Sequence, residues 1–120
     1  MKYMIMMFGD QAGLMESRSA DWIKDMIRFM HRFNDDLIKS GELASNEGLA
    51  DASQAKTVGL ENGIPVATDG PYAESKESLA GYWIVDVENE GRAIEIASRV
   101  VAFIECPVEV RRIGDAPADV

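Results

Sequence analysis

Apolar side chains follow two different patterns along the chain, and these patterns predict strands and helices. Residues 3–8 form a short, continuous apolar run, which is typical of a buried β-strand. Over residues 22–37, apolar side chains recur every three or four positions with charged residues between them, which predicts an amphipathic helix of about six turns. Ser17 or Ser19 can cap its start, and Gly41 suits the left-handed conformation that ends many helices.

The middle of the chain predicts a β-hairpin. Residues 42–54 are mostly polar or small, so we interpret them as a loop. Residues 56–61 and 64–68 flank Asn62-Gly63, a dipeptide that strongly favours a two-residue hairpin turn. Pro65 cannot donate a hydrogen bond to a neighbouring strand, and the second strand is therefore expected at the edge of a sheet.

The last third of the chain predicts a strand, a helix and a final strand. Residues 82–87 are rich in aromatic and β-branched side chains, which favours a strand. Glu88 or Asn89 can cap the helix that follows, and Pro107 prevents its continuation. Apolar and charged residues alternate over 108–113, which is typical of a half-exposed strand.

This order of elements predicts an α+β fold. Its simplest form is a ferredoxin-like βαββαβ arrangement with an extra hairpin, in which two helices cover one face of an antiparallel sheet. The apolar runs at residues 3–8 and 82–87 place apolar groups on both faces of their strands, whereas a single helical layer covers only one face. A second copy of the sheet would cover the other face, so we predict a homodimer.

Length, charge and cysteine content narrow the class of protein. The 120 residues fit one domain, placed at residues 1–113, with a short C-terminal tail at 114–120. A net charge of −9 repels phosphate backbones and anionic lipids, so neither nucleic acid nor a membrane is an expected partner. A single cysteine, Cys106, excludes an intrachain disulfide, and no apolar run reaches the length of a signal or membrane-spanning segment; both observations favour the cytoplasm.

The segment from Asp69 to Glu77 concentrates groups that can perform chemistry. It combines carboxylates, a Gly-Pro turn, an aromatic ring and a lysine within a few residues. A carboxylate near a lysine and an aromatic ring is suited to acid or base catalysis, so we predict that role for Asp69. A surface turn followed by a solvated charged run is the alternative interpretation. The neighbours expected to contact a small-molecule ligand are Tyr72, Glu74 and Lys76.

Three side chains elsewhere can join such a site. His31, the only histidine, can transfer protons near neutral pH and is the second catalytic candidate, although it can equally be a histidine at the edge of the helix's apolar face. Glu47 and Arg111 are predicted to bind ligand, since an arginine can hold a carboxylate or phosphate bidentately; the alternatives are solvated surface groups and ion pairs. Because no zinc-ligand cluster, P-loop or dinucleotide motif occurs, we expect no metal and no organic cofactor.

The Asp69–Glu77 segment also resembles the Asp-Gly-Pro-Phe motif of the YCII-related (DGPF-domain) family. Tyr72 replaces the usual phenylalanine of the motif, and Ser75 the usual threonine. The resemblance covers nearly the whole chain. Further matching positions are Lys2-Tyr3-Met4, Gly9-Asp10, Gly41, Leu43, Glu47-Gly48-Leu49, Leu79, Gly81-Tyr82-Trp83-Ile84 and Val108-Glu109-Val110-Arg111.

The resemblance implies a dimeric α/β barrel, in which two ferredoxin-like sheets pack face to face, and a cleft between the sheet and helices of each subunit. A His–Asp pair has been proposed as catalytic in the wider group. Asp69 carries over by position, whereas His31 lies one place from the expected helix position. Some family members are associated with sigma-factor-type transcription regulators.

Three classes of function fit these features. The first is a cofactor-independent small-molecule enzyme that uses Asp69 as acid or base. The second is a metabolite-binding or sensor module without chemistry, in which the same segment and Arg111 hold the ligand. The third is an interaction domain linked to sigma-factor-type transcription regulation, for which the dimer surface matters more than the cleft.

Overall fold

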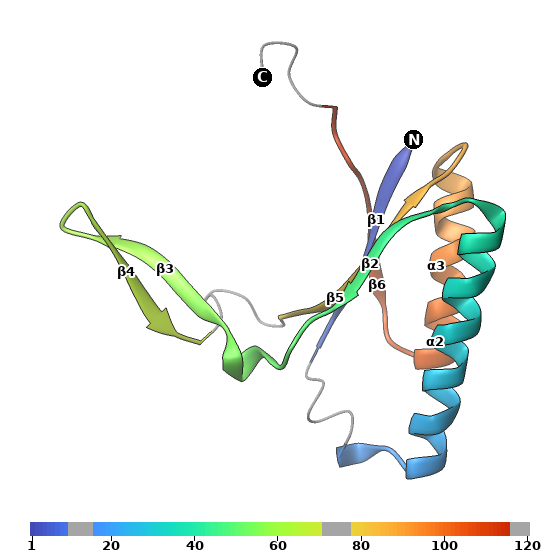
Figure 1. Ribbon diagram of the computed structural model, residues 1–120, viewed down its shortest axis with the longest axis horizontal. Coiled ribbons are helices and arrows are strands. Elements are labelled where there is room, and N and C mark those ends of the chain that lie inside the picture. Colours follow the sequence, from blue (N-terminus) through green and yellow to red (C-terminus); the bar gives the residue numbers. More distant parts are fainter. Residues whose placement is uncertain (10–15, 71–77, 116–120) are drawn as a thin grey trace.

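A four-stranded antiparallel sheet with two helices on one face forms the body of the molecule, and a separate hairpin projects from the opposite side (Figure 1). The computed structural model describes residues 1–9, 16–70 and 78–115. The elements in chain order are β1 (Lys2–Phe8), α2 (Ala20–Ser40), β2 (Leu43–Gly48), the 3-10 turn η1 (Ala52–Gln54), β3 (Lys56–Glu61), β4 (Ile64–Asp69), β5 (Leu79–Asp86), α3 (Glu90–Ile104) and β6 (Val108–Arg112).

The strand order confirms the predicted ferredoxin-like fold. The sheet runs β2-β5-β1-β6, and β1 pairs antiparallel with both of its neighbours. Helix α2 joins β1 to β2, and α3 joins β5 to β6, so each helix returns the chain to a strand two places along the sheet. Both helices lie on the same face, as Figure 1 shows, and among the described residues no helix covers the other face of the sheet.

Helix α2 begins and ends at the residues that the sequence indicates. The hydroxyl oxygen of Ser19 accepts a hydrogen bond from the N–H of Trp22 at 3.1 Å, which satisfies a donor of the first turn. Gly41 has φ 76°, and its N–H donates to the carbonyl oxygen of Ile38 at 3.1 Å. A side chain at this position would be strained, and glycine is not.

Helix α3 is fixed by similar local signals. The side chain of Asn89 accepts a hydrogen bond from the N–H of Arg92 at 2.9 Å, so Asn89 is the cap. The helix ends at Ile104, where Glu105 turns into the left-handed region, two residues before Pro107. Across the described residues, no helix has both the length and the apolar character to cross a bilayer.

The hydrophobic core lies between the sheet and the two helices. Its central contact is the ring of Phe33 on α2 against the ring of Trp83 on β5, edge to face with centroids 5.3 Å apart. Successive residues of a strand point to opposite faces, so only alternate positions of β1 and β5 enter this core. The buried members are Tyr3, Ile5, Phe33, Leu37, Trp83, Val85, Val87, Ala93, Ile96, Ala97, Val100 and Ile104.

The expectation of a loop over residues 42–54 is wrong for its first half, because Leu43–Gly48 forms the edge strand β2. This segment contains no β-branched or aromatic residue, so its own propensity for strand is low. Pairing with the neighbouring strand β5 stabilises β2 as a strand, because the backbones of the two strands pair from Leu43 to Gly48. Tertiary pairing thus overrides local propensity here.

The predicted hairpin is present but does not belong to the main sheet. Strands β3 and β4 pair in register around Asn62 and Gly63, which have φ 51° and 78°. Positive φ at both turn residues is the requirement that makes Asn-Gly favourable. At the other end of the hairpin, Lys56 and Asp69 form a cross-strand ion pair.

Candidate functional site

A cleft of about 480 Å³ lies between α2 and the end of the sheet where β1 and β2 finish and β5 begins. Four parts of the chain meet there, the end of β1, helix α2, the end of β2 and the start of β5, together with the C-terminal end of α3. The lining residues are Met7, Phe8, Gly9, Met26, Met30, Asn34, Asn46, Glu47, Gly48, Ala80, Gly81, Tyr82, Trp83, Ile104 and Cys106.

The apolar stripe of α2 builds both the core and the wall of this cleft. In its C-terminal half, Phe33 and Leu37 are fully buried against the sheet. In its N-terminal half, Met26 and Met30 continue the same stripe but are only half-buried, and they line the cleft. Methionine side chains are flexible and polarisable, so this wall can adapt to ligands of different shape.

Two glycines form one part of the cleft lining. Gly48 and Gly81 lie opposite each other in the β2–β5 pairing, so neither strand places a side chain there. A Cβ atom on Gly81 would approach the carbonyl oxygen of Glu47 to 2.9 Å, a distance that real Cβ atoms do not tolerate. A Cβ atom on Gly48 would have no neighbour within 4 Å.

The polar groups at the cleft are few and mainly neutral. The indole N–H of Trp83 donates to the side-chain oxygen of Asn34 at 2.8 Å, which fixes the amide so that its NH₂ group remains as a donor. Asn46, Glu47, Tyr82 and Cys106 are the other lining residues with polar side-chain groups. Among the described lining residues there is no lysine, arginine or histidine, so these residues do not neutralise an anionic ligand.

The structure places one predicted site residue, Glu47, among the lining residues. Asp69 ends β4 at the base of the hairpin, where its side chain is 91% exposed and paired with Lys56. It is not one of the residues that line the cleft.

His31 and Arg111 also lie apart from the cleft lining. His31 is exposed on α2. Arg111 lies on β6, where its guanidinium contacts the carboxylate of Glu109 at 2.8 Å and its side chain is 73% exposed. Tyr72, Glu74 and Lys76 lie outside the described residues, as does most of the predicted C-terminal tail, at 116–120.

The sequence analysis did not predict that the methionines, asparagines and paired glycines line a cleft, although Gly48 and Gly81 are among the positions that match the family. One signal could have located them. The apolar stripe of α2 extends over more turns than a seven-residue strand can cover, so one end of the helix must extend past the sheet. Within the described residues, no group of three or more histidine, cysteine, aspartate or glutamate side chains could hold a metal ion.

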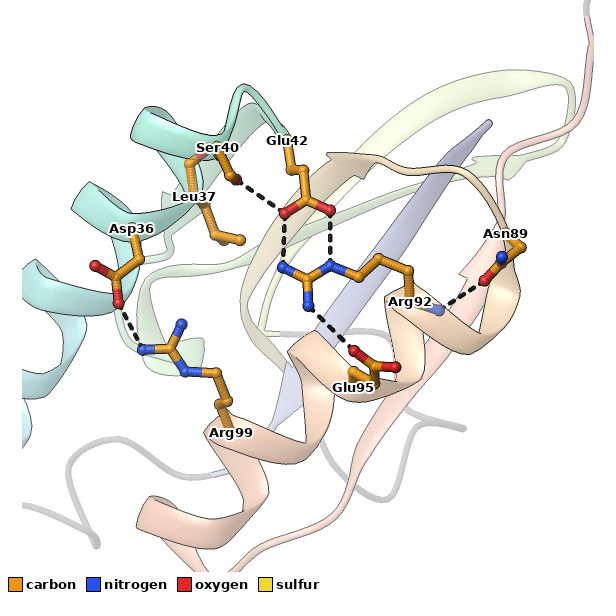
Figure 2. Close-up of polar contacts among 8 residues, drawn as sticks. All are labelled: Asp36, Leu37, Ser40, Glu42, Asn89, Arg92, Glu95 and Arg99. Atoms are coloured by element: carbon orange, nitrogen blue, oxygen red, sulfur yellow. Dashed lines mark hydrogen bonds and ion pairs between the residues drawn. The ribbon is translucent and has the colours of Figure 1, made fainter.

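A second polar cluster, at the opposite end of the helices, has a structural role (Figure 2). The guanidinium of Arg92 donates to both carboxylate oxygens of Glu42, at 2.8 and 2.7 Å, and also to Glu95 at 3.2 Å. The hydrogen bond from Arg92 holds the pKa of Glu42 below its ordinary value of 4.5. Burial of the carboxylate acts in the opposite direction, and the hydrogen bond from the hydroxyl of Ser40 lowers the pKa further. The hydrogen bond to Glu42, and to a smaller extent the hydrogen bond to Glu95, raises the pKa of Arg92.

These features identify the class of the protein, and comparison identifies its family. The sheet order and the helical layer define a ferredoxin-like α+β protein. The family model of the YCII-related domain matches residues 1–114, and the chain therefore belongs to the YCII-related family. A similar protein, the "Uncharacterized protein R00369" of Rhizobium meliloti (strain 1021), is 26% identical over 101 residues, which cover 81% of this chain and 77% of the relative. The predicted family resemblance is confirmed.

Proposed function

We propose that the protein binds a small, uncharged and mainly apolar molecule in the cleft beside α2. The observation that carries this proposal is the composition of the cleft: about 480 Å³ lined by methionines, aromatic rings and bare backbone, with a few polar groups, among which Glu47 is a carboxylate and none is a lysine, arginine or histidine. Volumes of about 300 to 1,000 Å³ with this balance of apolar and polar groups are typical of ligand sites.

The position of Asn34 specifies the polar part of the ligand. Its NH₂ group can donate to a carbonyl or hydroxyl oxygen, because its own oxygen already accepts from Trp83. A ligand carboxylate would lose its hydration without gaining a cation from the described lining residues, which is costly. Aromatic alcohols and ketones of one or two rings therefore fit best.

A matched pair of fluorescent probes tests this proposal. N-phenyl-1-naphthylamine is neutral, and 8-anilinonaphthalene-1-sulfonate has the same ring system with an added sulfonate. The neutral probe is expected to saturate a single site, with the sulfonate binding about tenfold more weakly or worse. Equal binding of both probes, or no saturable binding of the neutral one, would contradict the proposal.

Variants of Gly48 test whether the neutral probe binds in the cleft. Gly48→Leu puts a large side chain into open space and is expected to reduce probe affinity about tenfold or more. Gly48→Ala adds only one methyl group at the same position and is the matched control, with affinity close to that of the wild type. Unchanged affinity in Gly48→Leu would place the probe elsewhere.

A cofactor-independent enzyme that uses Asp69 is the second candidate, and one contact favours it. The carbonyl oxygen of Ser78 accepts a hydrogen bond from the N–H of Gly9, a cleft-lining residue, at 3.0 Å. The chain segment that begins at Asp69 therefore ends beside the cleft. Under this hypothesis Asp69→Asn abolishes turnover of a bound ligand and leaves its affinity intact, whereas full turnover in that variant excludes Asp69 as acid or base.

A further inference from the structure

Two asparagines line the cleft, and their side-chain amides are held differently. Asn34 on α2 accepts a hydrogen bond from the indole N–H of Trp83 at 2.8 Å, which fixes its amide. Asn46 on β2 is half-buried, and its side-chain amide forms no hydrogen bond with another described residue. An asparagine amide has both donor and acceptor groups, so Asn46 keeps one of each available to a ligand.

The strand register directs Asn46 to the side of the sheet that carries the helices. Asn46 lies opposite Trp83 in the β2–β5 pairing. Directly opposite residues place their side chains on the same face of a sheet, with Cβ atoms about 4.5 to 5.5 Å apart. Because Trp83 belongs to the core beneath the helices, the side chain of Asn46 lies on that side as well.

Both asparagines therefore lie beside one indole ring, Asn34 through its hydrogen bond and Asn46 across the strand pair. The next pair on the same face is Gly48 opposite Gly81, two residues further along each strand. Two residues of a strand span about 7 Å, which is close to the length of a benzene ring with one substituent. A ligand ring can thus lie over the open space at Gly48 with its polar end directed to the two amides.

The two amides present different groups to such a ligand. The oxygen of Asn34 is occupied by the indole N–H, so this side chain offers only its NH₂ donor. The oxygen of Asn46 has no such partner among the described residues and can accept a hydrogen bond from the ligand. A ligand that carries an acceptor but no donor would exclude water from this oxygen without replacing the hydrogen bond, which costs free energy.

We propose that the cleft selects aromatic α-hydroxy ketones. The ring lies over Gly48, the ketone oxygen accepts from the NH₂ group of Asn34, and the neighbouring hydroxyl donates to the side-chain oxygen of Asn46. The two ligand groups must be adjacent because both amides lie beside the same indole ring. This inference rests on the proposed function and narrows its ligand class. Asn46 determines the specificity, since Asn34 alone would bind a ketone without the hydroxyl equally well.

Phenacyl alcohol and propiophenone form a matched ligand pair, because a methyl group in the second replaces the hydroxyl of the first. The wild type is expected to bind phenacyl alcohol about tenfold more tightly, which corresponds to one additional hydrogen bond. Asn46→Leu keeps the size of the side chain but removes its polar groups, so it should abolish this preference and retain propiophenone binding. The control Ser45→Leu introduces the same side chain at an exposed neighbour outside the cleft lining and should keep the preference.

NMR titration of the ¹⁵N-labelled protein measures both the affinities and the position of the ligand. The indole N–H signal of Trp83 is expected to shift on binding, because the amide that accepts its hydrogen bond becomes polarised when it donates to the ketone. The indole of Trp22 packs against Phe103, is not among the cleft-lining residues and serves as the internal reference. A saturable shift at Trp22 alone would place the ligand elsewhere and overturn the inference.

The ligand pair separates failure of this inference from failure of the proposed function. Equal affinity of the wild type for the two ligands, or a preference for the hydroxyl that survives in Asn46→Leu, would overturn the role of Asn46. Saturable binding of propiophenone in the cleft would still support the proposed function in either case. If neither ligand bound, both the inference and the proposed function would be contradicted.

Discussion

Gly48 and Gly81 face each other across the β2–β5 pair but are glycines for different reasons. At Gly81, the carbonyl oxygen of Glu47 occupies the space that a side chain needs, so the close approach of the two backbones requires glycine. At Gly48 nothing lies within 4 Å of the point that a Cβ atom would occupy, and the space belongs to the cleft. The first glycine therefore serves the fold, and the second leaves room for a ligand.

This difference makes a prediction about stability. Gly81→Ala is expected to lower the free energy of unfolding by about 1 to 3 kcal/mol, because β2 must shift to relieve a 2.9 Å contact with backbone. Gly48→Ala should instead leave it unchanged or raise it by about 0.5 kcal/mol, since alanine restricts the unfolded chain. Urea denaturation of the two variants checks this, and equal stabilities would contradict the distinction.

At the scale of elements, the Glu42–Arg92 ion pair connects the end of α2 with the start of α3. Glu42 follows the C-terminal cap of α2, and its side chain is 16% exposed, while Arg92 lies in the first turn of α3. Two parallel N–H···O bonds fix both the distance and the relative orientation of these chain segments. Arg99 and Asp36 add a second link between the same helices at 2.9 Å (Figure 2).

The lowered pKa of Glu42 makes this link dependent on pH. Because the carboxyl ionises more readily in the folded state, its contribution is fully present above its ordinary pKa of 4.5 and is lost as the pH falls through the lower folded value. Glu42→Gln should therefore lower the free energy of unfolding by about 1 to 2 kcal/mol at pH 7, with the difference from the wild type shrinking below pH 4.5.

The control for this prediction is Glu95→Gln. Glu95 contacts the same arginine, but its side chain is 71% exposed and its bond is longer, 3.2 Å, so the substitution should have a smaller effect at every pH. Thermal unfolding measured from pH 3 to pH 7 compares the two. A loss of stability in Glu42→Gln that stayed constant across this range would exclude the proposed role of ionisation.

Elements whose signals are local could be predicted from the sequence, and those that depend on a distant neighbour could not. Helix α2 carries its own cap, apolar stripe and terminal glycine, and the structure confirms all three. Strand β2 carries no such local signal. It forms because its backbone pairs with β5, where its first residue, Leu43, lies opposite Val85 near the end of that strand. The whole β3–β4 hairpin lies between these two strands in the chain, so no local pattern in residues 43–48 could reveal their partner.

The candidate site could be predicted only in part, for a related reason. Glu47 was selected from the sequence and lines the cleft, but the other lining residues come together through packing of α2 against the sheet. The roles predicted for Asp69, His31 and Arg111 stay predictions, and the structure places these residues apart from the cleft lining. The sequence indicates which side chains are chemically reactive. It does not indicate where the folded chain leaves a space free of side chains, and that space is the cleft.

At the scale of the whole molecule, the helical layer and the β3–β4 hairpin lie on opposite sides of one sheet. The sequence already indicated that the sheet has two apolar faces, because the runs in β1 and β5 are apolar at successive positions. It did not indicate that the hairpin would leave the sheet, since a β3–β4 pair inside the sheet would have given the same alternation and the same Asn-Gly turn. The strand pairing seen in the structure is what shows it.

The position of the β3–β4 hairpin in the chain makes it removable. β2 and β5 are antiparallel neighbours, and the N–H of Leu49 donates to the carbonyl oxygen of Ala80 at 2.8 Å, so the chain leaves and re-enters the sheet at adjacent points. A gene in which residues 51–77 are replaced by a short turn would encode a smaller protein with the same four strands, two helices and cleft. That protein is expected to unfold cooperatively in urea and to keep its affinity for the neutral probe. The hairpin and the cleft would then be shown to be separable modules, open to loss or exchange one at a time.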